Sequence, residues 1–197
     1  PQELFVPVRP AGTPHAPLSP EAAARTGLGA APVCVAAGDN QASFVGSVRE
    51  PESSILVNVG TGGQVSAMVQ RFVRLPEVET RAFFQDRYLL VGAGLYGGRA
   101  YAYLRGFFRS VGSDLFGAPP DADLFEEMNR LAAQVAPGCN GLRCTPLFTG
   151  TRAHPELRGS ITGLGPTNMT PGHFARALLE GLAEGFHALH SQMEPAT

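Results

Sequence analysis

The chain has 197 residues, of which 44% are hydrophobic and 16% charged, a composition typical of a packed globular protein rather than a disordered one. Its formal net charge of -2 and its scattered basic residues argue against the clustered positive charge of a nucleic-acid-binding surface. No stretch approaches the roughly 20 consecutive apolar residues that a membrane-spanning helix needs. We therefore expect small molecules or other protein subunits as partners, with no nucleic acid and no membrane.

Residues 1–30 are rich in proline and alanine, and little regular structure is expected before residue 19. The segment Ser19-Pro20-Glu21 predicts a short helix that ends near Gly27, because a capping serine, a proline and an acidic first turn are typical helix-start signals. An apolar run at 33–37 predicts a short buried strand, with Cys34 as a small core residue.

A helix of small residues is expected at 41–48, followed by strands at 54–59 and 64–73. The tight glycine turn Gly60-Thr61-Gly62-Gly63 joins these two strands into a hairpin. A further strand is expected at 88–93, and the spacing of large side chains predicts a helix at 98–111.

The last third of the chain contains two clear helix signals. Asp123 is a suitable cap for a helix at 124–135, and Thr170 for a helix at 171–193. Residues 137–168 lack a periodic pattern and are expected to be mainly loop. Because strands and helices interleave along the chain, the predicted class is α/β.

Asp39 is the first candidate functional residue. It follows a predicted buried strand, at the end where open α/β sheets place ligands, and its carboxylate could accept a proton from a substrate hydroxyl. On the residues alone, a simple helix cap is the commoner role for such an aspartate.

Three other features have both a functional and a structural interpretation. The turn at 60–63 could hold phosphate through its backbone N–H groups, or be an ordinary glycine turn. The glycines at 97 and 98 precede a helix, which suits either phosphate binding or close packing. Arg152 could reach a phosphate, although a structural ion pair is the better explanation of a single arginine.

The cysteines and histidines give weaker signals. Cys139 and Cys144 could form a disulfide or bind a metal ion, but free thiols in a reducing cytoplasm explain three cysteines more simply. His187 and His190 are expected at a solvated helix end.

Taken in chain order, the segments resemble the FGGY family of carbohydrate kinases. The resemblance rests on five pieces: a linker-like segment at 10–28, Gly38-Asp39-Asn40-Gln41-Ala42, Asn58-Val59-Gly60-Thr61-Gly62, the pair of segments 147–152 and 158–164, and a last-helix signature at 176–181. Residues 38–48, 58–66 and 95–98 look most like sedoheptulose kinases, with xylulose, glycerol and gluconate kinases as alternatives.

This resemblance implies a partial domain of the actin-like ATPase or ribonuclease H-like fold, with a glycine-turn hairpin and flanking helices. Residues 1–30 would be an interdomain linker, and residues 31–197 part of the C-terminal, ATP-side domain. The family's N-terminal domain and its glycine-rich adenosine motif are missing. The isolated chain is therefore expected to be inactive.

The implied activity is ATP-dependent phosphorylation of a primary hydroxyl of a sugar, such as the ketose sedoheptulose. In this assignment Asp39 is the catalytic base, Asn40 and Gln41 contact the sugar, and the ATP-binding residues are Gly60, Thr61, Gly62 and Gly98. Mg²⁺ would bridge the phosphates mostly through water, so no protein ligand is named. A cytoplasmic location is expected, and a homodimer would be unsurprising.

Two other classes of function fit the same residues. One is a non-catalytic sugar- or nucleotide-binding module of the actin-like ATPase fold. The other is a structural or oligomerisation domain without a ligand.

Overall fold

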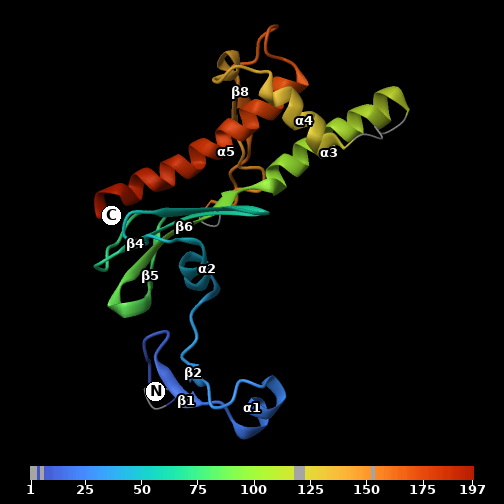
Figure 1. The fold of residues 1–197 in the computed structure, drawn as a ribbon. Coiled ribbons are helices and arrows are strands. Elements are labelled where there is room, and N and C mark those ends of the chain that lie inside the picture. Colours follow the sequence, from blue (N-terminus) through green and yellow to red (C-terminus); the bar gives the residue numbers. More distant parts are fainter. Residues whose placement is uncertain (1–3, 5–6, 118–122, 152–153) are drawn as a thin grey trace. The chain divides into compact units, whose positions relative to one another are not determined.

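The computed structural model of the chain describes residues 4, 7–117, 123–151 and 154–197. The chain forms two compact units (Figure 1). Unit 1 comprises Pro1–Leu56, Ser66–Val91 and Met193–Thr197, and unit 2 comprises Val57–Val65 and Gly92–Gln192. Strands β3 (Ile55–Val59), β4 (Gly62–Val69) and β6 (Tyr88–Tyr96) each have residues in both units.

Unit 1 begins with a small antiparallel pair formed by β1 (Pro14–Pro17) and β2 (Pro32–Cys34), connected through α1 (Pro20–Thr26). The Ser19 hydroxyl accepts the N–H of Ala22 at 3.2 Å, and Gly27 ends the helix in the left-handed conformation that glycine favours. The helix prediction is confirmed, while β1 was not predicted.

The prediction of a buried strand at 33–37 was wrong. The observed strand ends at Cys34, which is exposed, and the side chain of Val33 is 43% exposed. An apolar run is buried only when a second layer covers it. Here β2 pairs with β1 in a two-stranded sheet whose residues stay open to solvent in the described structure.

The main sheet has four strands in the order β3-β4-β6-β5, where β5 is Glu79–Ala82. β5 pairs antiparallel with β6, and Arg81 lies opposite Leu89. The predicted hairpin of β3 and β4 is confirmed, although β4 ends at Val69, earlier than expected. The separate strand predicted at 88–93 is also present, as β6, and continues to Tyr96. β5 was missed because Glu79–Ala82 lacks the alternating apolar pattern of a half-buried strand.

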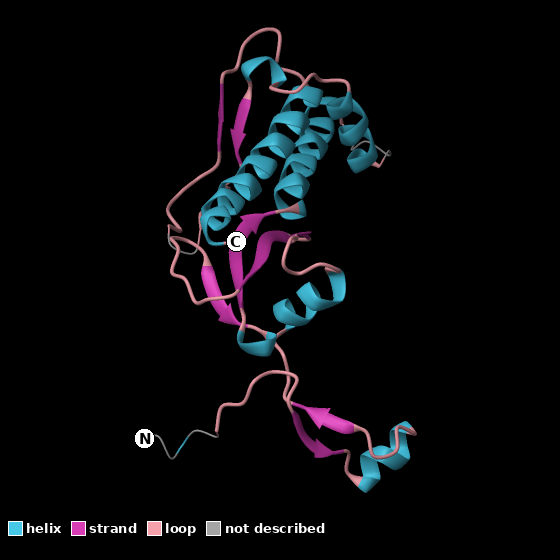
Figure 2. Ribbon diagram, turned by 60° about the vertical axis from the view of Figure 1, so that its left-hand side comes forward, coloured by secondary structure: helices cyan, strands magenta, loops and turns pink. Residues whose placement is uncertain are grey.

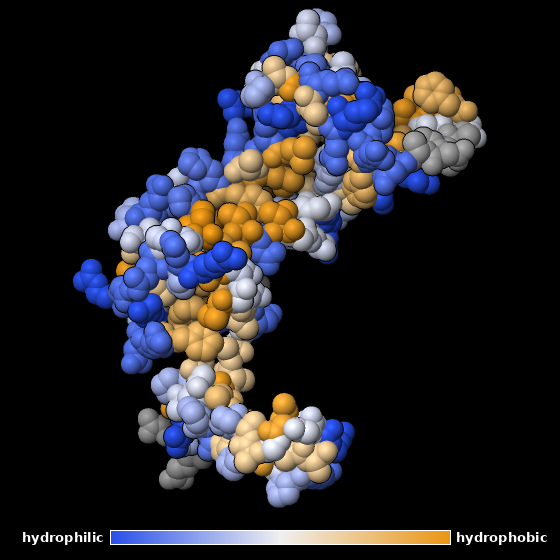
Figure 3. All heavy atoms as spheres, in the orientation of Figure 1, coloured by the Kyte–Doolittle hydropathy of each residue, from blue (hydrophilic) through white to orange (hydrophobic). Residues whose placement is uncertain are grey.

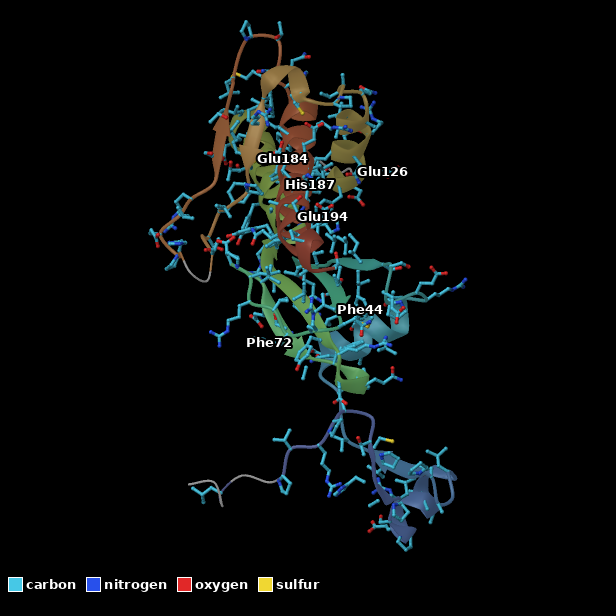
Figure 4. All side chains as sticks on the ribbon, turned by 90° about the vertical axis from the view of Figure 1, so that its left-hand side faces the viewer. Phe44, Phe72, Glu126, Glu184, His187 and Glu194 are labelled. Atoms are coloured by element: carbon cyan, nitrogen blue, oxygen red, sulfur yellow. The ribbon has the colours of Figure 1, made fainter. Side chains whose placement is uncertain are left out.

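Helix α2 (Asp39–Ser47) contributes Phe44 to the core of unit 1, where that side chain is fully buried (Figure 4). Its ring meets the Phe83 ring edge-to-face, with the centroids 5.7 Å apart. The other buried members of this cluster come from β4 and β6: Met68, Leu89 and Val91. Phe44 thus fixes α2 against the sheet, and with it the position of the residues at the start of the helix.

Unit 2 contains α3 (Gly98–Phe116), α4 (Leu124–Ala133) and most of α5 (Pro171–Met193), which share one core (Figure 2). Asp123 caps α4 by accepting the Phe125 N–H at 2.9 Å, and the Thr170 hydroxyl accepts the His173 N–H at 3.4 Å at the start of α5. Both predicted caps are confirmed. At the far end of α3, Leu115 and Phe116 are exposed, and Figure 3 shows apolar side chains there.

The segment predicted as loop also contains a short antiparallel pair, β7 (Arg143–Thr145) and β8 (Ser160–Thr162). Helix α5 lies directly against β7, since a Cβ atom at Gly181 would be only 1.9 Å from the Cys144 carbonyl oxygen. Strands of this length give no periodic signal, which explains why they were missed. None of the helices in the described ranges is both long and apolar enough to cross a membrane.

Candidate active site

The glycine turn between β3 and β4 is held by the first residues of α3. Within the turn, the Gly60 N–H donates to the Gly62 carbonyl at 2.9 Å. From α3, the Gly98 N–H donates to the Gly60 carbonyl at 2.8 Å, and the Arg99 N–H to the Thr61 carbonyl at 3.2 Å. Two donors at the start of α3 that could have faced a phosphate are therefore used to fix the turn.

Gly97 and Gly63 allow helices to approach this turn closely. A Cβ atom at Gly97 would lie 2.5 Å from the Gly60 carbonyl oxygen and 2.7 Å from that of Gly62. A Cβ atom at Gly63 would lie 2.3 Å from the Phe186 ring of α5. The turn is thus packed between α3 and α5, and the glycines around it have a steric as well as a conformational role.

Thr61 is the polar residue that the turn presents to solvent. Its side chain is exposed, and neither its N–H nor its hydroxyl has a hydrogen-bond partner in the described part of the chain. Both groups are free to donate to an anion.

A cavity of about 230 Å³ adjoins Thr61 and lies wholly within unit 2. Its lining comes from the turn, the end of β6, the start of α3 and the segment 149–151: Thr61, Gly62, Gly94, Leu95, Tyr96, Arg99, Thr149, Gly150 and Thr151. The Tyr96 hydroxyl hydrogen-bonds Thr149 and donates to the Gly150 carbonyl at 3.2 Å, which ties the segment 149–151 to β6. No carboxylate is among the described residues of this lining.

Asp39 is the first helical residue of α2, and the cap position belongs to Gly38. The helix-cap explanation of Asp39 is therefore wrong. One carboxylate oxygen, Oδ1, accepts the N–H of Asn40 at 2.7 Å, and the other has no partner among the described residues. The side chain is exposed, so this second oxygen is available to accept a proton or a hydrogen bond from a ligand.

Asn40 and Gln41 differ sharply in their surroundings. The Asn40 side chain is 5% exposed, and neither its Oδ1 nor its Nδ2 has a partner in the described chain. A buried amide without hydrogen bonds costs about 1–3 kcal/mol, so such a group needs an explanation. Gln41 instead donates from Nε2 to the Ala82 carbonyl at 3.1 Å, which ties α2 to β5.

The predicted site residues thus lie in two groups. Asp39, Asn40 and Gln41 are in unit 1, at the start of α2. The predicted ATP-binding residues are brought together in unit 2 by the turn and the α3 start: Gly60, Thr61, Gly62 and Gly98. Arg152 lies outside the described residues. Tyr96 and Arg99 were not among the predicted site residues, although both lie next to the glycine pair at 97 and 98 whose phosphate-binding role was considered.

The three cysteines are free thiols, with Cys139 and Cys144 buried. Burial, and for Cys139 also the nearby Glu180 carboxylate, raises the pKa of each buried thiol to about 11. Glu180 accepts hydrogen bonds from the Arg176 guanidinium at 2.7 Å and from the Cys139 thiol at 3.4 Å. Within the described ranges, no three His, Cys, Asp or Glu side chains are placed to hold a metal ion.

A second cavity of unit 2, of about 440 Å³, lies between α5 and the segment 137–144. Glu184 and His187 of α5 line it (Figure 4). Glu184 forms an ion pair with Arg143 at 3.2 Å, with both side chains largely exposed. This cavity contains none of the predicted site residues.

Known proteins resemble the chain over much of its length. It is 29% identical to the xylulose kinase of Staphylococcus epidermidis over 151 residues, which are 74% of this chain and 28% of that protein. It is 28% identical to the sedoheptulokinase of Mus musculus over 164 residues, which are 80% of this chain and 34% of that protein. The chain therefore spans about a third of the length of these relatives.

The crystal structure of xylulose kinase from Rhodospirillum rubrum superposes with a TM-score of 0.81 at 27% identity, covering 96% of this chain and 37% of that protein. The fold is accordingly that of an actin-like ATPase, and the chain holds part of such a domain. Residues 56–196 match the FGGY family of carbohydrate kinases, C-terminal domain. Since this match covers more than half of its residues, the chain belongs to the FGGY family of carbohydrate kinases.

Proposed function

We propose that the chain is the ATP-side part of an enzyme that transfers a phosphoryl group from ATP to a primary hydroxyl of a sugar. Residues 1–30 would be the linker to a preceding domain, and residues 31–197 part of the C-terminal domain. Membership of the kinase family supports the reaction class. The observation that carries the catalytic assignment is the exposed Asp39 carboxylate, which has one oxygen without a partner in the described structure.

In this proposal Asp39 orients the sugar hydroxyl and accepts its proton as the phosphoryl group is transferred. Phosphoryl transfer depends mainly on positioning and on stabilising charge, so the main contribution of Asp39 would be to orient the attacking hydroxyl. Helix α2 would hold Asp39 in place, because Phe44, near the helix centre, is anchored in the core of unit 1.

We propose Asn40 as the sugar contact on α2. Its buried amide has unmet hydrogen-bonding capacity, which a polyol hydroxyl could satisfy once the covering side chains move. Gln41 was assigned a similar role, but its amide N–H is already donated to Ala82. In this proposal the Gln41 amide N–H contacts a sugar only if its hydrogen bond to the Ala82 carbonyl breaks.

For the ATP phosphates we propose Thr61 as the main contact, through its N–H and hydroxyl, with Gly60 and Gly62 letting the backbone approach. Gly98 would act by fixing the turn, because its N–H is donated to Gly60. The described residues that line the cavity beside the turn include no carboxylate and so do not supply a ligand set for Mg²⁺. We assign no step to the metal.

Sedoheptulose is the proposed acceptor, on the sequence resemblance around Asp39 and the turn. Xylulose is the main alternative, because the two relatives named for these sugars are almost equally similar. Glycerol and gluconate complete the set to be tested. A cytoplasmic location is proposed as well, where the free thiols would stay reduced.

The test is sugar-dependent ADP release by the protein with its flanking sequence restored, against sedoheptulose, xylulose, ribulose, glycerol and gluconate. Asp39→Asn should lower turnover by about 100-fold or more, the scale of a lost general base. Asp114→Asn, an exposed aspartate on α3, is the matched control and should keep full turnover.

Near-normal turnover in Asp39→Asn would overturn the catalytic assignment. ATP binding without release for any sugar would favour a non-catalytic binding module. Turnover by the 197-residue chain alone would contradict the view that it is an incomplete kinase.

A further inference from the structure

The cavity beside the glycine turn is lined by an arginine that the catalytic proposal does not use. Arg99 is the second residue of α3, and it lines this cavity together with Thr61. Its guanidinium has no ion pair, hydrogen bond or aromatic partner among the described residues. An arginine that lines a cavity and neutralises no carboxylate is available for an anionic ligand.

The backbone places this cation next to the turn. The N–H of Arg99 donates to the Thr61 carbonyl at 3.2 Å, so the two residues are in direct contact. The Thr61 N–H and hydroxyl remain unpaired in the described chain. The main chain of Arg99 and the two Thr61 donors are therefore neighbours, and the exposed Arg99 side chain extends from this position.

The rest of the cavity adds hydrogen-bonding groups but no negative charge. Arg99 is the one charged residue in its described lining. On the far side, the segment 149–151 is held by the Tyr96 hydroxyl, and the Tyr96 ring meets the Phe148 ring edge-to-face at 6.3 Å. A cavity whose described lining has one unpaired arginine, several hydrogen-bond donors and no carboxylate favours an anion.

We infer that Arg99 binds the phosphate chain of the nucleotide, as a cationic contact beside Thr61. This inference rests on the proposed function, because it assumes that the turn binds a nucleoside triphosphate. It adds a specific electrostatic contact to a site otherwise built from neutral groups. It also predicts that affinity depends on the number of phosphates rather than on the base.

The experiment uses the protein with its flanking sequence restored, as in the turnover test, and measures binding of ATP, ADP, AMP, adenosine and inorganic tripolyphosphate by calorimetry. Arg99→Gln should weaken ATP and tripolyphosphate binding about tenfold, weaken AMP binding less, and leave adenosine binding unchanged. The slope of log Kd against log salt concentration should also fall, because one charge contact is lost. Arg99→Lys should retain part of the affinity, since the charge is kept but the planar fork is lost.

Arg109→Gln is the matched control, because it removes the same charge from an exposed position on the same helix that does not line the cavity. It should bind every ligand as the wild type does. Thermal unfolding of each variant without ligand shows whether the fold is retained, and Arg99→Lys replaces Arg99→Gln in the comparison if the latter unfolds.

Three results would overturn the inference. Equal ATP affinity in Arg99→Gln and wild type would show that Arg99 does not contact the phosphates, and it would leave the proposed kinase function intact. Equal losses in Arg99→Gln and Arg109→Gln, or a loss that extends to adenosine, would show a general effect. Failure of this wild-type protein to bind either ATP or tripolyphosphate would overturn both the inference and the proposed phosphate role of Thr61.

Discussion

Gly97 lies so close to Gly60 that a Cβ atom at position 97 would be 2.5 Å from the Gly60 carbonyl oxygen. The obstructing atom belongs to the backbone, so no side-chain rotation can relieve the contact. The start of α3 and the proposed phosphate turn are therefore one rigid assembly, in which a change on either side must displace the other.

Gly97→Ala should lower the free energy of unfolding by about 1–3 kcal/mol, the usual cost of forcing an extra group into a packed site. Gly106→Ala on the same helix is the control, because a Cβ atom there meets nothing within 4 Å. It should raise stability by about 0.5–1 kcal/mol, since alanine is the better helix former. Urea unfolding measures both values, and equal effects of the two variants would contradict the packing described for the turn.

Asp39 and Asp123 are both aspartates at helix starts, yet we expect different effects on stability. Asp123→Ala removes a side chain that accepts the Phe125 N–H at 2.9 Å, so it should cost about 1 kcal/mol. Asp39→Asn leaves Gly38 at the cap and keeps an acceptor for the Asn40 N–H. It should cost only about 0.3 kcal/mol, the low end of the effect of an exposed first-turn charge.

Denaturant unfolding of both variants, combined with the turnover assay, separates a catalytic from a structural role. Asp39→Asn should lose activity while remaining folded, whereas Asp123→Ala should lose stability and keep its turnover. Comparable destabilisation by the two substitutions would show that Asp39 has a structural role at the start of α2 as large as that of a helix cap.

Local signals in the sequence predicted the helices well, because a cap is a contact between neighbours in the chain. Ser19, Asp123 and Thr170 each accept a backbone N–H two or three residues ahead, as expected. The strands β5, β7 and β8 are short, and their pairing partners are not encoded in their own residues. They could not be predicted from periodicity.

The site was predictable to the extent that it lies in contiguous motifs. Asp39 and Thr61 stand in such motifs, whereas the cavity with Arg99 depends on segments from distant parts of the chain. The hydrogen bond from Gln41 to Ala82 joins residues 41 positions apart, so it was equally invisible in the sequence. Burial was misjudged at Cys34, because an apolar run does not say whether another layer covers it.

The cysteines should differ in their reactivity with a thiol reagent at pH 8. The buried thiols have a pKa of about 11, so at this pH they carry about a hundredth of the thiolate of a thiol at the usual 9.0. Cys34 is exposed and should react first, while Cys139 and Cys144 should react only when the protein opens. Cys34→Ser should abolish the fast phase, and a fast phase that persists in this variant would contradict the burial of the other two.

Glu180 should make stability depend on pH in the acidic range. Partial burial raises the pKa of its carboxyl, but hydrogen bonds from Arg176, the Gly138 N–H and Cys139 outweigh this effect and lower the pKa below its usual value of 4.5. A carboxyl whose pKa is lowered by folding stabilises the folded protein at pH values above 4.5, and this contribution is lost as the pH falls below that value.

Glu180→Gln should therefore be less stable than wild type at pH 7, by about 1 kcal/mol for charged hydrogen bonds at a partly exposed site. The difference should shrink as the pH falls below 4.5, because the wild-type carboxyl then becomes neutral too. Glu184, on the same helix as Glu180, forms an exposed ion pair with Arg143 of β7. Glu184→Gln removes this pair and should change stability at pH 7 by less than about 0.5 kcal/mol. If the difference in unfolding free energy between Glu180→Gln and wild type stays constant from pH 7 to pH 3, the charge of Glu180 does not stabilise the contact of α5 with Gly138.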